Sequence, residues 1–400
     1  MCKSKVLKPL KPAVGQPAEG ESKYFPRPRI TKKIRRMMGQ GGHILVSAPR
    51  RIGKTSLLKD IQAHPNKDQI IKYIVVQSVN SSEEFFRKMY SELIRDTEIY
   101  NGISGYVKQM GHAVRNRFTR LRGVSLEGGI EIDAQDNIDY YNECYELIRG
   151  FERKKVIIII DEFPDALNNI FQQSRDLAIH FLQQHRDLRQ QFSHDNLQFI
   201  YTGSTGLRNV VRKIGNTNLI NDINEITVKP FSHDESRLLI RRLVLGYQKH
   251  DDEFDLSEAQ IETILRRITW HLPYYLQAIV QSLFDHHEES GKAIDDNTIQ
   301  AVFIAMTKAK SPYSSYFENW VHRLEKAFND EDFKLAMVML SRSAVDNELS
   351  KSTLSELKKQ HEQADCKYVI HTLEYDGYFN EEHLFNSNLL KQWWIENVID

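Results

Sequence analysis

The segment 44–58 (ILVSAPRRIGKTSLL) constrains the fold more than any other part of this 400-residue chain. Its apolar start predicts a short strand, and Thr55 to Ala63 predicts a helix. Between them, Ala48 to Thr55 (APRRIGKT) matches the pattern G-x-x-x-x-G-K-[ST] at every position except the first. A loop of this form, between a strand and a helix N-terminus, turns backbone N–H groups toward an anion. The segment therefore predicts a phosphate-binding loop inside an α/β domain.

Within this loop, Lys54 is expected to neutralise β- and γ-phosphate oxygens, and the Thr55 hydroxyl to bind Mg²⁺. Ala48 places a Cβ where glycine is usual, which keeps open the alternative of a nucleotide-bound scaffold with negligible turnover. The residues expected to contact the nucleotide here are Pro49, Arg50, Arg51, Ile52, Gly53, Lys54, Thr55 and Ser56.

A second motif, Asp161-Glu162 after an apolar strand, argues against the alternative that Gly53-Lys54-Thr55 follows a strand by chance. The run 156–160 is fully apolar, as in a strand buried on both faces of a parallel sheet, and it leads directly into Asp161-Glu162. Asp161 is expected to join the Mg²⁺ shell, and Glu162 to polarise the water that attacks the γ-phosphate. Such residues fit the carboxyl ends of the strands, where open α/β sheets bind ligands. The pair favours attack by water over transfer to a bound acceptor, so a small-molecule kinase is disfavoured.

A third strand, Leu197 to Thr202, ends in small polar residues. Thr202 or Ser204 could contact the γ-phosphate or the attacking water, although each could equally serve as an ordinary strand exit. Arg208 and Arg212 follow four residues apart on one predicted helical face. Either could be an arginine finger, and either could be a solvated surface arginine; Arg208 is the one included among the candidate catalytic residues.

Strands separated by helices predict an open parallel sheet over residues 24–231, with further strands at 70–77 and 225–228. An insertion of about 99–134, rich in glycine, contains a hairpin candidate at 124–132. Helix starts without intervening strands predict a helical lid over 232–310. Short helices, a small hairpin and a last helix predict a winged-helix-like domain over 311–400. Residues 1–23, rich in Lys, Pro and Gly, are expected to form a disordered basic tail.

The motifs together resemble the archaeal/bacterial ATPase group of the AAA+-related STAND NTPases. APRRIGKTSLL, VIIIIDEFPDAL and FIYTGSTGL carry the resemblance, and 221–231 (NDINEITVKPF) is similar to the segment that enters the lid. Tyr24 to Arg27 resembles the family's F-x-R box, and 271–276 (HLPYYL) resembles its G-x-P lid motif. His271 replaces the usual glycine, and Pro28-Arg29 replaces the acidic stretch that often follows the box.

The resemblance implies an α/β P-loop NTPase fold with a helical lid and a C-terminal winged helix. It also implies binding of ATP with Mg²⁺, with Phe25, Arg27 and Pro273 near the base. The implied activity is ATP hydrolysis that drives a conformational switch between the domains. The implied partners are a second copy of the chain or another protein, engaged through the winged-helix domain.

Charge separates this hypothesis from a DNA-engaging ATPase of the initiator or transposition type. Lys+Arg 54 equals Asp+Glu 54, and residues 365–400 carry many more acids than bases. Such a surface repels phosphate, so DNA binding is not favoured, although the basic tail and the arginines at 115–122 argue for it. No apolar run is long enough to span a membrane, no secretory signal is evident, and three scattered cysteines fit a cytoplasmic protein. The histidines show no zinc-site spacing.

Overall fold

The computed structural model describes residues 7–109, 138–151, 154–192, 196–203, 206–251 and 253–399. The hairpin predicted at 124–132, most of the predicted insertion and the arginines at 115–122 lie outside these residues. The chain divides into two compact units. The sheet unit comprises Pro26–Ala48 and Lys54–Val228. The helical unit comprises the described residues up to Phe25, the loop Pro49–Gly53, and the residues from Lys229 onward.

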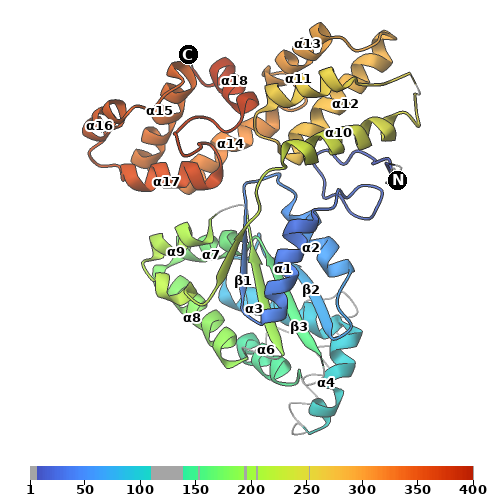
Figure 1. Ribbon diagram of the computed structural model, residues 1–400. Coiled ribbons are helices and arrows are strands. Elements are labelled where there is room, and N and C mark those ends of the chain that lie inside the picture. The colour runs from blue at the N-terminus through green and yellow to red at the C-terminus, as the bar shows by residue number, and fades with distance from the viewer. Residues whose placement is uncertain are drawn as a thin grey trace. The chain divides into compact units, whose positions relative to one another are not determined.

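Five parallel strands form the centre of the sheet unit, in the order β2-β3-β4-β1-β5 (Figure 1). They are β1 (Ile44–Ser47), β2 (Gln69–Val75), β3 (Lys155–Asp161), β4 (Leu197–Thr202) and β5 (Asn224–Thr227). The apolar run 156–160 of β3 is at most 2% exposed, which confirms that this strand is covered on both faces. The parallel α/β fold predicted from the motifs is therefore confirmed.

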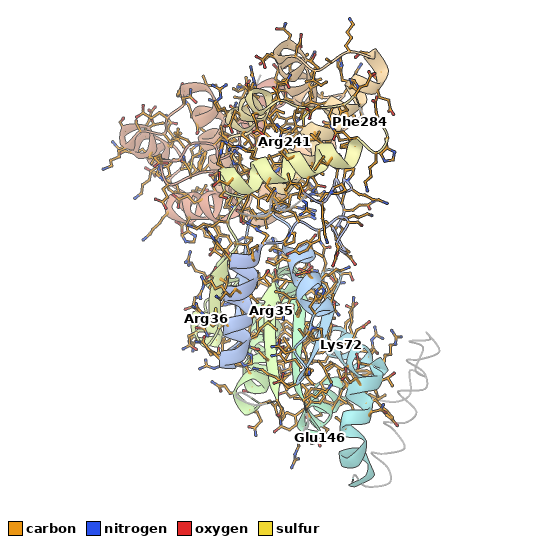
Figure 2. All side chains as sticks on the ribbon, turned by 45° about the vertical axis from the view of Figure 1, so that its right-hand side comes forward. Arg35, Arg36, Lys72, Glu146, Arg241 and Phe284 are labelled. Atoms are coloured by element: carbon orange, nitrogen blue, oxygen red, sulfur yellow. The ribbon has the colours of Figure 1, made fainter. Side chains whose placement is uncertain are left out.

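Alternate residues of the strands face two different layers of helices. Ile158 and Ile160 belong to the main apolar core, which includes α3 (Ser82–Arg95), α6 (Tyr140–Arg149), α7 (Phe163–Gln173), α8 (Arg175–Gln191) and α9 (Leu207–Ile214). Among its described residues, this unit also contains α4 (Thr97–Gln109) and the 3₁₀-helix η1 (Thr217–Ile220). On the other face lie α1 (Pro28–Gln40) and α2 (Lys54–Ala63), in front of the sheet in Figure 1. Arg35 and Arg36 mark α1 in Figure 2.

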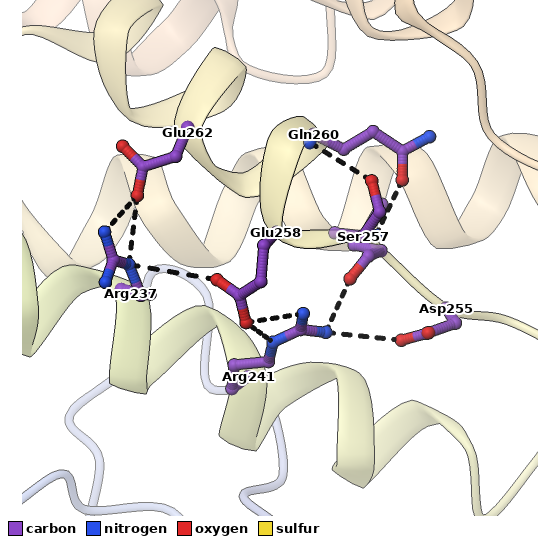
Figure 3. A network of polar contacts seen from close by, with 8 residues as sticks. Arg237, Arg241, Asp255, Ser257, Glu258, Gln260 and Glu262 are labelled. Carbon is purple, nitrogen blue, oxygen red and sulfur yellow. Dashed lines mark hydrogen bonds and ion pairs between the residues drawn. The ribbon is translucent and has the colours of Figure 1, made fainter.

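The helical unit contains no strand of two or more residues among its described residues. Its first four helices are α10 (His233–Tyr247), α11 (Glu258–Ile268), α12 (Pro273–Ser290) and α13 (Asp296–Thr307). The predicted capping boxes at Ser232/Glu235 and Ser257/Gln260 are both present. In each box the serine side chain accepts a hydrogen bond from the backbone N–H of the partner, and the partner's side chain accepts one from the backbone N–H of the serine. The first two helices are further joined by Arg237 and Arg241 of α10, which contact Glu262 and Glu258 of α11 (Figure 3).

Five more helices complete this unit: α14 (Ser314–Ala327), α15 (Asp330–Asp346), α16 (Lys351–Gln360), α17 (Cys366–Asp376) and α18 (Asn388–Asn397). Between the last two, Phe379 and Phe385 form an antiparallel bridge, where the sequence predicted a small hairpin. The predicted order of helices, turn and final helix is present. The assignment of residues 311–400 to the winged-helix family stays a prediction.

The N-terminal segment differs from its prediction. The expected disordered tail covered residues 1–23, but from Leu7 onward the described residues contact the helical unit. Leu10 is 1% exposed, and its N–H donates to the Arg242 carbonyl at 2.8 Å. The Ala13 N–H donates to Gln277 Oε1 at 2.8 Å. A single buried leucine and backbone hydrogen bonds order a segment whose composition is typical of disorder, because the helices supply the partners that the segment lacks.

No helix among the described residues is long and apolar enough to cross a membrane.

Candidate nucleotide-binding site

The phosphate-loop motif forms a tight turn between β1 and α2. Its backbone has two residues with positive φ, Arg51 at 65° and Gly53 at 89°. Gly53 carries no Cβ and adopts this conformation without strain, whereas Arg51 is held in it by its surroundings. Ile52 between them is fully buried and anchors the turn. The first turn of α2, from Lys54, therefore begins directly at the loop, as an anion site at a helix N-terminus requires.

Lys54 closes the loop from inside. Its side chain is 7% exposed, and its ammonium Nζ donates to the carbonyl oxygen of Ala48 at 2.8 Å. The alanine that replaces the usual glycine thus contributes a backbone acceptor, and its own side chain is buried.

The sheet brings Asp161 to Thr55, 106 positions earlier in the chain. Thr55 Oγ1 donates to Asp161 Oδ2 at 3.4 Å, and the N–H of Glu162 donates to Asp161 Oδ1 at 3.1 Å. The two residues predicted to bind Mg²⁺ are therefore neighbours, and both carboxylate oxygens have a donor. Burial raises the pKa of Asp161, as does the charge of Glu162, while the hydrogen bond from Tyr73 and the Lys54 charge oppose this shift.

Tyr73 is a site residue that the sequence did not reveal. It lies on β2, paired in register with Ile159 of β3, and its hydroxyl donates to Asp161 Oδ2. Burial and the Asp161 charge raise the pKa of the Tyr73 hydroxyl, so it stays protonated and remains a donor. In the sequence, Tyr73 is one residue of an apolar strand. Only the pairing of β2 with β3 would have placed it beside the acid.

Glu162 occupies an unusual backbone position, with φ 58° at the N-cap of α7. It is one of five non-glycine residues with positive φ in the described ranges, and Arg51 is another. Strained residues of this kind cluster at functional sites. A Cβ added to Gly203, at the end of β4, would lie 3.3 Å from Glu162 Oε2 and 2.5 Å from Pro164 Cδ. The absence of a side chain at Gly203 therefore makes room for the Glu162 carboxylate.

The remaining predicted catalytic residues differ in their surroundings. Thr202 is fully buried, and its hydroxyl donates to the Val46 carbonyl at 3.1 Å, which ties β4 to β1. Arg208 Nε donates to Glu225 Oε2 at 2.6 Å, so its guanidinium has a partner within its own chain. Ser204 lies outside the described residues. The roles predicted for these three residues stay predictions.

Two loop arginines belong to the helical unit and make their contacts there. The Arg51 guanidinium carbon lies 5.1 Å from the Tyr274 ring centroid and 5.6 Å from that of Tyr316, and Nη1 donates to the Gly15 carbonyl at 2.8 Å. Arg50 donates to Asn319 Oδ1 on α14. The loop is thereby linked to α12, to α14 and to the N-terminal segment.

The residues predicted to lie near the base are divided between the units. Phe25 and Pro273 belong to the helical unit, and Arg27 to the sheet unit. Phe25 packs edge-on against Phe231, with ring centroids 5.2 Å apart, and Pro273 is the first residue of α12. Arg27 is 8% exposed at the N-cap of α1.

The donor set fits Mg²⁺ bound together with a nucleotide. No group of three or more His, Cys, Asp or Glu side chains that could hold a metal occurs among the described residues. Mg²⁺ is characteristically held by one or two carboxylates together with water and substrate phosphates. Asp161 and the Thr55 hydroxyl supply oxygen ligands of that kind.

Comparison with known proteins agrees with this geometry. Residues 35–211 match a family model described as an AAA domain. The chain carries an AAA domain of the P-loop ATPases. This AAA domain includes β1 to β4, the phosphate-binding loop and the Asp161-Glu162 pair. A search of curated protein sequences finds no match.

Among solved structures, the Walker-type ATPase PABY2304 of Pyrococcus abyssi is similar with a TM-score of 0.57 at 15% identity. The match covers 97% of this chain and 98% of that chain. At this identity the likeness shows a shared fold. The Aeropyrum pernix ORC2 protein, solved in ADPNP–ADP complexes, has 10% identity and a TM-score of 0.48, with 93% and 92% of the two chains covered.

Proposed function

We propose that the chain binds Mg-ATP at the loop of its AAA domain and hydrolyses it, acting as a regulatory ATPase. The observation that carries this proposal is the convergence of Lys54, Thr55, Asp161 and Glu162 within the sheet unit. The closer assignment to the archaeal/bacterial ATPase group rests on the sequence motifs.

Each residue has a distinct chemical task in this proposal. The backbone N–H groups of the loop and the Lys54 ammonium bind the β- and γ-phosphates. Thr55 and Asp161 hold Mg²⁺, which supplies charge neutralisation at the phosphate oxygens. Glu162 accepts a hydrogen bond from the attacking water and orients it. Its left-handed backbone at the end of β3 projects the carboxylate beside Gly203.

The loop also supports coupling between nucleotide state and the helical unit. Pro49–Gly53 cluster with that unit, whereas their chain neighbours Ala48 and Lys54 belong to the sheet unit. Arg51 is held by Tyr274, Tyr316 and Gly15, and γ-phosphate is an alternative partner for its charge. ATP binding would compete with these contacts, and the helical unit would respond. A second copy or a protein partner would sense that response through residues 311–400.

Hydrolysis is tested by measuring phosphate release and fluorescent-ATP binding for wild type, Lys54→Ala and Glu162→Gln. We expect Lys54→Ala to lose binding, and Glu162→Gln to bind ATP while its turnover falls by about 100-fold or more. Glu92→Gln, at a half-buried i,i+3 partner of Arg95, is the matched control and should keep full turnover. Equal turnover in Glu162→Gln and wild type would refute the assigned role. Tight ATP binding without turnover in wild type would favour the nucleotide-bound scaffold instead.

The coupling is tested by amide hydrogen exchange in α12 and α14 at saturating ATP. Wild type should show an ATP-dependent change in both helices, and Arg51→Gln should show none. An identical ATP response in the variant would mean that Arg51 does not connect the loop to the helical unit.

A further inference from the structure

The outer face of α1 is a concentrated cationic surface on a chain whose net charge is zero. This helix (PRITKKIRRMMGQ) contains five basic residues and no acid. Arg29, Lys32, Lys33 and Arg36 are exposed, and no ion pair or hydrogen bond joins their side chains to another residue in the described ranges. We refer to these four residues as the α1 cationic face.

The opposite face of α1 packs against the rest of the sheet unit. Ile34 and Met38 are at most 1% exposed. Lys155 Nζ donates to the Met38 carbonyl at 2.7 Å, and Gln198 Nε2 donates to the Met37 carbonyl at 3.4 Å, so side chains of β3 and β4 satisfy its last turn. The fifth cation, Arg35, donates to the His64 carbonyl at 2.7 Å. Figure 2 labels Arg35 and Arg36 on this helix. The four remaining cations thus project from a fixed scaffold.

We propose that the α1 cationic face binds the phosphodiester backbone of duplex DNA. Arg29 and Arg36 are two helical turns apart, about 10 Å, and that length of duplex axis carries about six phosphates. Backbone binding needs lysine and arginine side chains and no apolar contact. A protein interface would instead have an apolar centre depleted of charge. No exposed position of α1 carries a large apolar side chain.

The acidic C-terminal residues do not contradict this surface. They argue against DNA binding by residues 365–400, and α1 belongs to the other unit. Because the contacts are to phosphate, binding should not depend on base sequence and should weaken steeply with salt. The proposal does not depend on ATP turnover, so the two can fail separately.

The test measures the affinity of the full chain for a fluorescent 30-base-pair duplex by anisotropy, from 50 to 200 mM salt. Four phosphate contacts predict a slope of log K against log salt of about −3.6, a loss of about 100-fold over that range. The variant with Arg29, Lys32, Lys33 and Arg36 all changed to Gln should lose nearly all of this slope. The matched control changes the exposed residues Lys351, Lys358, Lys359 and Lys367 to Gln and removes the same charge.

Retained binding in the control and loss in the α1 variant would support the proposal. Absence of binding by wild type at 50 mM salt, an unchanged slope in the α1 variant, or equal losses in both variants would each overturn it. ATP binding by the α1 variant, measured in parallel, verifies that its AAA domain is folded. If wild type failed to bind ATP, the proposed ATPase function would be wrong. The DNA proposal would still be decided by the anisotropy measurements alone.

Discussion

Replacement of Tyr73 by phenylalanine tests whether the described geometry positions the metal. The change removes one hydroxyl and keeps the ring, so packing on β2 is preserved. Asp161 Oδ2 would then keep only the Thr55 hydroxyl, at 3.4 Å, as its described side-chain donor. The carboxylate would be less firmly oriented toward the loop. We therefore expect Tyr73→Phe to weaken Mg²⁺ binding in the nucleotide complex and to leave metal-free nucleotide binding unchanged.

Two independent lines of reasoning give the same magnitude. A hydrogen bond to a charged group contributes about 1.5–3 kcal/mol net. Loss of a residue that orients a metal ligand typically lowers metal affinity by about 10–100-fold, or roughly 1.4–2.7 kcal/mol. The expected rise in the Mg²⁺ midpoint is accordingly about 10-fold or more.

The assay titrates Mg²⁺ into the protein with a fluorescent ATP analogue and records the midpoint, with affinity in EDTA as the reference. Tyr145→Phe is the control, because the Tyr145 ring packs against Phe192 with centroids 4.9 Å apart, away from Asp161. A midpoint for Tyr73→Phe within about twofold of wild type would refute the positioning role, since that is below the expected range. Loss of nucleotide affinity in EDTA would likewise refute it, because the effect would not be specific to the metal.

Three further outcomes are expected. Gly203→Ala would place a Cβ 2.5 Å from Pro164 Cδ, destabilise the fold by about 1–3 kcal/mol and displace Glu162. Phosphate release should therefore fall while ATP still binds, and full turnover would contradict this. Burial lowers the pKa of His43 from 6.5 to about 4 in the folded chain. Between these two pH values the unfolded chain therefore binds more protons than the folded chain. Stability should therefore fall from pH 6.5 toward 4 by roughly 3 kcal/mol from this residue, and denaturant titration of His43→Gln should show a smaller loss. Gly246→Ala would place a Cβ 1.9 Å from the Leu10 carbonyl oxygen and so displace the N-terminal segment from the helix. Tryptic cleavage after Lys11 should then become about tenfold faster, and an unchanged cleavage rate would contradict that contact.

Local patterns in the sequence were sufficient for the parallel α/β class and for the motifs at Lys54-Thr55 and Asp161-Glu162. A strand followed by a glycine-containing turn and a helix start is encoded within about fifteen residues. The capping boxes at Ser232 and Ser257 are equally local, since donor and acceptor lie three positions apart. The unbroken apolar run 156–160 also indicated a strand that is buried on both faces.

Tertiary structure decided every feature that depends on contacts between distant segments. Tyr73 meets Asp161 only because β2 pairs with β3, and no local pattern specifies that neighbour. Residues 7–23 are ordered because they have hydrogen-bond partners on α10 and α12. The composition of the segment, which is typical of disorder, does not reveal those partners. The basic residues of α1 were visible in the sequence. Their projection from one anchored face became apparent only when Ile34 and Met38 were seen to be buried, because helix docking determines which side chains stay in solvent.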